Sequence, residues 1–405
     1  MGSYWILIAA ALLLASGPLN SVPLLLISVL LFILAGVSRL WAHYSLTRLD
    51  CEFALSSSRA FTGDAVELVV RVTNWKGLPL PWVSVLQEIP REVTVLEEAS
   101  HRSIDPGRAT IRSDFSLGWY HRITRKYTLR CDRRGYFNFG PSTIRSGDLF
   151  GLYTQLTEIE PHGDLTIYPR VLPVIYPRAL SRELHGSIRA KRHPLVDTTR
   201  PMGTREYLAG DDLRHIHWKA SARLGRLQTR VYDVSATPSF VIFLDVRTVP
   251  RPRYDARIDL LELGVLTATA LANDALENRL STGVYVNGPS RFNSGLIQVP
   301  PSQNPDQFSL ILEAMADVGP FEATPISRLL RTQGKGLRWG TAVLVVTAVP
   351  DESTTMILTQ LQSAGHSVGL VQIGASNGAR FASGLPIYSV SDEVDWTELQ
   401  TITIE

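Results

Sequence analysis

The sequence contains only two cysteines among 405 residues, Cys51 and Cys131. Two thiols cannot supply a disulfide framework or a four-thiolate zinc site, so the simplest interpretation is two free thiols in a reducing compartment. Charged residues are also few, at 19% against 45% hydrophobic residues, which excludes an intrinsically disordered chain. The formal net charge of +2 argues against a nucleic-acid partner, because such proteins carry strongly basic surfaces.

Charged side chains are absent from residues 1–38, which contain two apolar runs, 4–15 and 22–37, separated by the turn-forming sequence SGPLNS. A membrane-spanning helix needs about 20 apolar residues, and each run approaches this length with its flanks. We therefore predict a transmembrane helical hairpin over residues 1–46. A cleaved signal peptide is the alternative, but no Lys or Arg precedes the first run and a second run follows directly.

Positive charge near the membrane ends predicts the orientation of this hairpin. The turn carries no positive charge, whereas Arg39 and Arg48 closely follow the second run. We therefore predict a protein that crosses the lipid bilayer of the cell membrane twice and has its soluble domains in the cytoplasm. Aromatic residues stand where interfacial residues usually lie, at Trp5, Trp41 and Tyr44.

Residues 47–172 contain short alternating runs separated by turn residues, such as 66–72 followed by Lys76-Gly77. This spacing predicts an all-β, immunoglobulin-like sandwich. The tryptophans at 75, 82 and 119 are interpreted as core or corner residues. No cluster of catalytic side-chain types occurs here, so the domain is interpreted as a spacer or binding module.

Residues 173–202 are predicted to form a basic linker. A solvated connection is one interpretation, and a patch that faces the anionic inner leaflet or an acidic partner is the other. The basic residues are Arg178, Arg182, Arg189, Lys191 and Arg192.

Residues 203–223 read GTREYLAGDDLRHIHWKASAR and bring two carboxylates close to two histidines. Asp211 or Asp212 is a suitable N-cap for a helix over 213–224 that ends at Gly225. On one helix, His215 and His217 lie about 200° apart and cannot bind the same ion.

The charged residues of this segment predict either a docking surface or an internal ion-pair lattice formed by Asp211, Asp212, Arg214, Lys219 and Arg223. A simpler interpretation is that these charges only lock the segment onto the next domain. A docking or structural role of these charges is favoured over a catalytic role.

This segment resembles the signature of the family called domain of unknown function 58. A second pattern in the β-rich part, R-R-G-Y…G-P…D-x-F-G-L, is similar too, and comprises Arg133, Arg134, Gly135, Tyr136, Gly140, Pro141, Asp148, Phe150, Gly151 and Leu152. The resemblance implies paired membrane helices, a domain similar to von Willebrand factor A, and a partner of the MoxR-type AAA+ ATPase class. Other membrane proteins are further expected partners, and no reaction is implied. The motif positions are Gly203, Arg205, Glu206, Tyr207, Gly210, Asp211, Asp212, Arg214, Ile216, Trp218, Lys219 and Arg223.

Residues 203–405 contain this motif and then strands that alternate with helices, beginning with the continuous apolar run 239–245. This order predicts an α/β, Rossmann-like domain with a mainly parallel sheet covered on both faces. In such sheets ligands bind at the carboxyl ends of the strands, where Asp245 stands.

In von Willebrand A domains that position opens a D-x-S-x-S motif that binds Mg²⁺. This chain reads Asp245-Val-Arg-Thr-Val249, so we predict that Arg247 pairs with Asp245 in place of a cation and that no cofactor is bound. A bound Mg²⁺ is the alternative, with Asp245, Thr248, Thr324 and Asp351 as candidate ligands.

The chain has neither a phosphate-binding G-x-x-x-x-G-K-[ST] motif nor a G-x-S-x-G nucleophile elbow. We therefore predict a multidomain, membrane-anchored, non-enzymatic interaction or scaffold protein that works with an AAA+ ATPase in the assembly or maturation of envelope or other protein complexes. The alternative is a divalent-metal-dependent binding module or hydrolase that uses Asp211 and Asp212, or Asp245.

Overall fold

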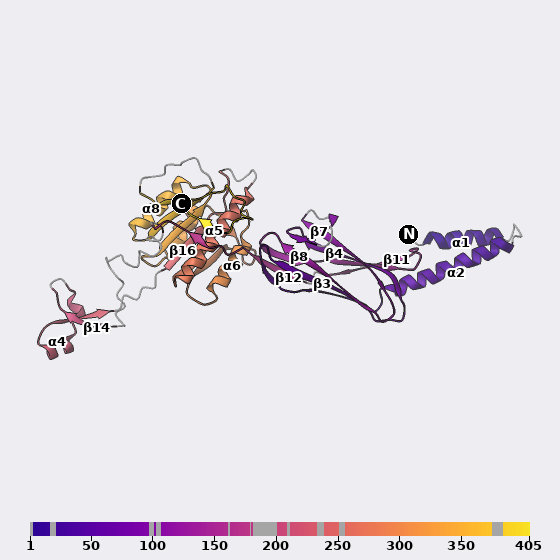
Figure 1. The fold of residues 1–405 in the computed structure, drawn as a ribbon, viewed down its shortest axis with the longest axis horizontal. Coiled ribbons are helices and arrows are strands. Elements are labelled where there is room, and N and C mark those ends of the chain that lie inside the picture. The colour runs from indigo at the N-terminus through magenta and orange to yellow at the C-terminus, as the bar shows by residue number, and fades with distance from the viewer. Residues whose placement is uncertain are drawn as a thin grey trace. The chain divides into compact units, whose positions relative to one another are not determined.

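A computed structural model describes residues 3–16, 22–96, 101–102, 107–160, 163–178, 180, 201–208, 211–232, 239–250, 256–374 and 384–405. The chain divides into two compact units, residues 1–170 and 171–405. Figure 1 traces both along the chain.

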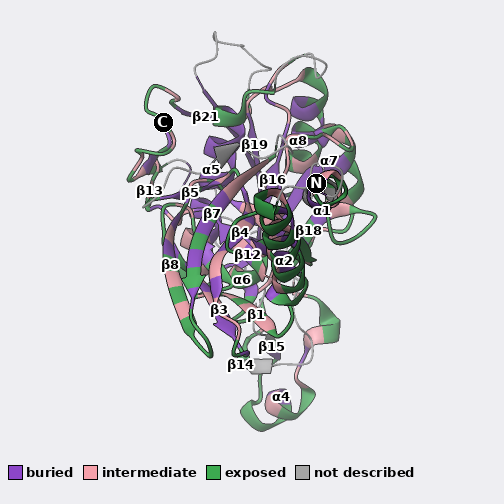
Figure 2. Cartoon of the chain, turned by 90° about the vertical axis from the view of Figure 1, so that its right-hand side faces the viewer, coloured by how far each residue is buried: buried purple, intermediate pink, exposed green. Residues whose placement is uncertain are grey.

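Two apolar helices, α1 (Ser3–Ser16) and α2 (Val22–Ser45), begin the first unit and pack against each other. α2 has 24 residues and is the single helix of the described residues that is long and apolar enough to cross a membrane. α1 has 14 residues, fewer than the ~20 that a span requires. Most apolar side chains of α2 are exposed, as Figure 2 shows. One candidate span near the N-terminus is thus present.

The rest of the first unit is built from three sheets, in which neighbouring strands are antiparallel except for β2 and β12, which pair in parallel. Their orders are β1-β3-β8-β5 and β11-β10-β4-β7-β6, and a smaller sheet has the order β2-β12-β9. The strands are β1 (Leu49–Leu55), β2 (Arg59–Phe61), β3 (Ala65–Asn74), β4 (Leu80–Pro90), β5 (Val93–Val95), β6 (His101–Arg102), β7 (Arg108–Leu117), β8 (Arg122–Cys131), β9 (Gly135–Phe139), β10 (Ser142–Gly147), β11 (Thr154–Ile159) and β12 (Gly163–Tyr168).

One hydrophobic core joins the two larger sheets. It takes Val70 and Leu129 from the first sheet and Val85 and Phe115 from the second. Burial alternates along β3, because successive side chains of a strand point to opposite faces. The predicted two-layer β-domain is therefore observed.

For Trp75 and Trp119, predicted as core or corner residues, the core interpretation is wrong and the corner interpretation stays open. Trp75 is 53% exposed and Trp119 is 71% exposed, because both lie in loops beyond the alternating strands. Trp82 lies within β4, is half-buried, and donates a hydrogen bond from Nε1 to the Asp148 carbonyl oxygen over 3.1 Å.

The second unit is centred on a six-stranded sheet with the order β18-β17-β16-β19-β20-β21. All neighbouring strands are parallel except β18, which pairs antiparallel to β17. Its elements are β13 (Val174–Ile175), β14 (Pro201–Glu206), the 3₁₀ helix η2 (Leu213–His215), α4 (Trp218–Leu224), β15 (Gln228–Tyr232), β16 (Ser239–Leu244), α5 (Ile258–Glu277), β17 (Ser281–Pro289), β18 (Leu296–Ser302), α6 (Gln307–Asp317), α7 (Ile326–Gly334), β19 (Ala342–Thr347), α8 (Glu352–Ser363), β20 (Ser367–Ile373), β21 (Ile387–Val390) and β22 (Ile402–Thr403).

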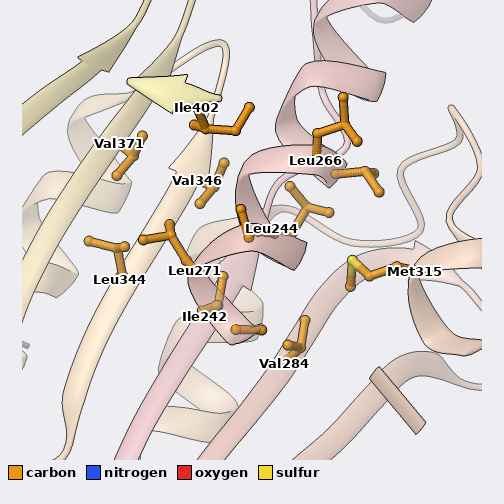
Figure 3. Packing of buried hydrophobic residues seen from close by; sticks show 14 of the residues in the cluster. Ile242, Leu244, Leu266, Leu271, Val284, Met315, Leu344, Val346, Val371 and Ile402 are labelled. Atoms are coloured by element: carbon orange, nitrogen blue, oxygen red, sulfur yellow. The ribbon is translucent and has the colours of Figure 1, made fainter. Parts of the chain in front are cut away.

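Helices cover both faces of this sheet, as the buried strand β16 predicts. Ile242 and Leu244 pack on the face covered by α5 and α6, which Figure 3 shows from close by. Val241 and Phe243 point to the other face and pack with residues of α7 and α8. The mainly parallel α/β sheet is therefore observed, and its carboxyl edge is where β16 ends at Leu244.

The segment predicted as a linker, 173–202, begins inside the second unit rather than in solvent. β13 pairs with β22, and Tyr176 donates a hydrogen bond to Asp274 Oδ2 over 2.7 Å. Leu180 is fully buried in the core of this unit. Apolar side chains at these positions explain the difference. The basic residues Arg182, Arg189, Lys191 and Arg192 lie outside the described residues.

Candidate functional site

The motif segment forms an antiparallel hairpin of β14 and β15 that encloses two short helical elements. The continuous helix predicted over 213–224 is wrong, because the chain is extended at Ile216, with φ −64° and ψ 128°. There Ile216 bridges Thr229, and the His217 amide donates to the Gln228 carbonyl oxygen over 2.8 Å. Pairing with β15 thus replaces helical hydrogen bonds between η2 and α4.

Each helical element has its own cap. Asp212 Oδ1 accepts a hydrogen bond from the Arg214 amide over 3.0 Å, which confirms the N-cap expected at Asp211 or Asp212. His217 caps α4, since its Nδ1 accepts from the Ala220 amide over 3.1 Å. Gly225 ends α4 with a left-handed φ of 68°, as predicted.

Asp211 is the polar centre of the hairpin. Its carboxylate accepts from Arg205 Nη2 over 2.6 Å, from the Leu208 amide over 3.0 Å and from Thr229 Oγ1 over 3.3 Å. The hydrogen bond from Arg205 is the main reason that the pKa of Asp211 is lowered. Asp211 therefore ties β14, the following turn and β15 together.

The structure does not assemble the predicted ion-pair lattice. Among the described residues, Arg214, Lys219 and Arg223 form no side-chain ion pair. The observed pairs are Arg205 with Asp211, and Arg226 with Glu206 over 3.5 Å. Gly210 lies outside the described residues, and Gly203 and Tyr207 belong to the paired backbone around the hairpin.

The large apolar residues of this segment differ in burial. Ile216 is 4% exposed, whereas Trp218 is 68% exposed and Leu213 is 65% exposed. Figure 2 shows α4 largely in the colour of exposed residues. We call the exposed apolar and cationic residues of η2 and α4 the motif surface, and it consists of Leu213, Arg214, Trp218, Lys219, Arg223 and Leu224.

A second polar centre lies at the carboxyl edge of the α/β sheet. Asp245 follows β16 and is buried, and its two oxygens accept hydrogen bonds from Asn287 Nδ2 over 2.8 Å and from Thr347 Oγ1 over 2.9 Å. The Arg247 amide also donates to Asp245 Oδ1 over 3.1 Å. Burial raises the pKa of Asp245, while these hydrogen bonds and the charge of Arg247 oppose the rise.

The Arg247 guanidinium lies between two carboxylates. Its Nη2 donates to Asp351 Oδ2 over 3.2 Å and to the Val349 carbonyl oxygen over 3.0 Å, and its Nε is 4.0 Å from Asp245 Oδ2. The predicted pairing with Asp245 is thus observed as an ion pair at its distance limit, without a hydrogen bond from Nε to any described residue, whereas the hydrogen bonds of the guanidinium go to Asp351 and Val349. Burial alone would raise the pKa of Asp351, but hydrogen bonds from Thr354 and Ser353 and the charge of Arg247 lower it.

The candidate metal ligands do not converge on one position. The Thr248 hydroxyl accepts from the Arg257 amide over 2.9 Å, and the Thr324 amide donates to the Asn287 carbonyl oxygen over 3.4 Å. Within the described ranges, no three His, Cys, Asp or Glu side chains are close enough to hold an ion. Because protein donors occupy both oxygens of Asp245 and a guanidinium supplies the positive charge, these residues do not fit Mg²⁺.

Three residues of this centre were not predicted. Asn287 and Thr347 lie beside Asp245 because β17 and β19 flank β16 in register. Asn287 follows the apolar run 284–286 and Thr347 follows the apolar run 342–346, which is a signal that the sequence does contain. Glu322 also lies close enough for charge interaction: burial raises its pKa most, and Asp245 and Asp351 raise it further.

Comparison with known proteins gives a distant relative and several partial structural likenesses. The chain is 24% identical over 299 residues to the uncharacterized protein YeaD of Bacillus subtilis, covering 73% of this chain and 68% of that one. Solved structures with similar parts include a CARDB domain from Pyrococcus furiosus, with 13% identity and a TM-score of 0.20, covering 29% of this chain and 91% of that one. A cohesin module from Clostridium perfringens gives 15% identity and a TM-score of 0.21, covering 30% of this chain and 97% of that one. The family model described as protein of unknown function DUF58 matches residues 203–377, which include both polar centres.

Proposed function

We propose that this chain is a membrane-anchored, non-enzymatic interaction or scaffold protein whose partner is a MoxR-type AAA+ ATPase. The observation that carries the proposal is the ion pair of Arg247 with Asp245 and Asp351 at the sheet edge. A guanidinium bonded to Asp351 and to the Val349 carbonyl oxygen, and 4.0 Å from Asp245, holds the loops after β16 and β19 in place and supplies the positive charge that a metal ion would otherwise bring. A preformed binding edge is the role that this arrangement favours.

The architecture supports this role in finer detail. We propose that α1 and α2 form a transmembrane hairpin with the soluble units on the cytoplasmic side, and that the β-domain is immunoglobulin-like. Counted from β16, the strand order of the second unit is 3-2-1-4-5-6, with the third strand antiparallel. This order is doubly wound and supports a von Willebrand A-like domain, whose ligands bind at the edge where Asp245 lies.

The motif surface supplies the second supporting observation. It combines an exposed Trp218 with cations that have no acidic partner among the described residues. Aromatic and arginine side chains provide most of the binding energy at protein interfaces. A partner with an acidic, partly apolar face fits this surface, so we propose that the ATPase presents such a face.

The experiment is crosslinking in native membranes, with and without nucleotide, followed by identification of the captured proteins. The test variant combines Trp218→Ser with Arg223→Glu, since both side chains are exposed and the hairpin contacts remain. Lys335→Glu, at an exposed position after α7, is the matched control. We expect the test variant to lose capture of an AAA+ ATPase by at least about tenfold. Equal capture by test variant and control would exclude the motif surface as the interface.

The alternative, a divalent-metal-dependent module or hydrolase using Asp211 and Asp212 or Asp245, requires these carboxylates to be available. Asp211 is bonded to Arg205 and Asp212 caps η2. Metal analysis of the purified chain separates the alternatives: one equivalent of Mg²⁺ or Zn²⁺ that is lost in Asp245→Ala would favour the metal-dependent module.

A further inference from the structure

An open cleft of the first unit lies between α2 and the turn that leads into β11. Gly36, Arg39 and His43 of α2 line one side, Tyr153 and Gln155 line the other, and the volume is about 480 Å³. A Cβ atom built on Gly36 meets no atom within 4 Å, so the space beside the helix is open. The volume is in the range of small-ligand sites.

The polar groups of this cleft suit an anion that accepts several hydrogen bonds. Arg39 and His43 are four residues apart, so both side chains project from the same face of α2. None of the described lining residues is acidic.

The turn opposite α2 is held in place by Asp148. The Asp148 carboxylate accepts from the Tyr153 amide over 2.7 Å and from the Phe150 amide over 3.0 Å. Leu149 and Phe150 at its tip remain 63% and 60% exposed. A turn fixed by a buried carboxylate thus exposes two large apolar side chains a few residues before Tyr153, which lines the cleft.

The position of the cleft along α2 matches the level of lipid headgroups. From Val22 to Arg39 the helix rises about 26 Å at 1.5 Å per residue, close to the ~30 Å hydrocarbon thickness of a bilayer. Leu40, next to the cleft, is 61% exposed. Arg39 would therefore lie at the level of the lipid phosphates, with the apolar side chain of Leu40 next to it in contact with acyl chains.

We propose that this cleft binds the phosphate group of an anionic membrane phospholipid, with Arg39 and His43 as donors and with the exposed side chains of Leu40, Leu149 and Phe150 against its acyl chains. The proposal rests on the membrane anchoring in the proposed function. The bound lipid fixes the β-domain against the bilayer surface.

The test is native mass spectrometry of the full chain, released from nanodiscs that contain phosphatidylglycerol and phosphatidylcholine. We expect retained phosphatidylglycerol in the wild type and about a tenfold loss in Arg39→Gln. Gly36→Leu fills the cleft without changing its charge, so this variant should lose as much bound phosphatidylglycerol as Arg39→Gln. Lys126→Gln, at an exposed pair on β8, is the control and should retain the lipid.

Separate outcomes distinguish the sources of failure. The lipid site would be overturned if Arg39→Gln and Gly36→Leu still retained phosphatidylglycerol. The membrane anchor would stay supported in that case if both variants still sedimented with carbonate-washed membranes. A wild-type chain released by carbonate would overturn the anchor itself, and the lipid site with it. Displacement of the lipid by millimolar glycerol phosphate would assign the cleft to a soluble phosphate instead.

Discussion

The Arg247 guanidinium and the Asp351 carboxylate are joined by a 3.2 Å hydrogen bond that links the loop after β16 to the loop before α8. Asp351 also caps α8, since its Oδ1 accepts from the Thr354 amide over 2.8 Å. One ion pair therefore connects a helix N-terminus, the buried Asp245 and the edge of the sheet. Glu322 lies close enough for its pKa to respond to the charges of Asp245, Asp351 and Arg247, so Arg247 offsets the charge of several carboxyl groups at this edge.

Replacement of Arg247 by Ser should destabilise the α/β unit and create a metal dependence. Removal of one partner leaves the carboxylates of Asp245 and Asp351 without their counter-charge, at a cost of about 2 kcal/mol, or about 5 °C in Tm. Millimolar Mg²⁺ should restore part of the loss in Arg247→Ser and leave the wild type unchanged, because an ion that binds only the folded state stabilises it. Thermal unfolding in chelator and in Mg²⁺ measures both effects.

The control for this variant is Arg257→Ser. Arg257 also bridges two carboxylates, Asp259 and Asp392, but its side chain is 51% exposed. A surface pair of this kind contributes less than about 1 kcal/mol. An Arg247→Ser chain as stable as the control, with no response to Mg²⁺, would contradict the role given to Arg247.

Replacement of Asp211 by Asn should loosen the motif hairpin and alter its acid sensitivity. Asn keeps the shape but loses the charge that binds Arg205, so amide exchange across β14 and β15 should become several-fold faster. Because the pKa of Asp211 is lowered in the folded chain, its contribution is present at neutral pH and is lost as the pH falls below its usual value of 3.8.

Hydrogen exchange at matched intrinsic rates measures this effect, with Glu206→Gln as the control. Glu206 forms an exposed 3.5 Å pair with Arg226 in the same hairpin. If acidification reduces the protection of these amides from exchange equally in the wild type and in Asp211→Asn, Asp211 is not the acid-sensitive group.

The local sequence pattern was sufficient to predict strands that are buried along their whole length. The apolar run 239–245, predicted as the first strand of the parallel sheet, contains β16, and the replacement of a metal-ligand Ser position by Arg247 predicted the observed ion pair. The edge strand β18 was missed because Pro300 and Pro301 lie within it, and proline is tolerated only on such edges. The break at Ile216 was missed because it depends on pairing with Thr229, a contact that helical periodicity cannot reveal.

Replacement of Lys76 by Met should weaken the connection between α2 and the β-domain. Lys76 Nζ donates to the carbonyl oxygens of Ser45 over 2.5 Å and Thr47 over 2.6 Å, where the helix end leaves acceptors without intrahelical partners. Loss of these bonds should cost about 1–2 kcal/mol in the full chain in detergent micelles. Lys126→Met, whose lysine forms an exposed pair with Glu67, should cost less than about 0.5 kcal/mol. Equal Tm values for the two variants would contradict the prediction.

The same lysine should make the stability of the β-domain rise with pH in an alkaline window. Burial lowers the pKa of Lys76 from 10.5 to about 8, so between these values the unfolded chain binds more protons than the folded chain. The free energy of unfolding therefore increases as the pH rises through this range, since the folded state no longer has to bury a charge. The difference in Tm between the wild type and Lys76→Met should grow from pH 8 to pH 10.5, whereas the difference between the wild type and Lys126→Met should stay constant. Other groups that titrate in this range cancel in both differences, so a Lys76→Met difference that stays flat would show that Lys76 keeps its ordinary pKa.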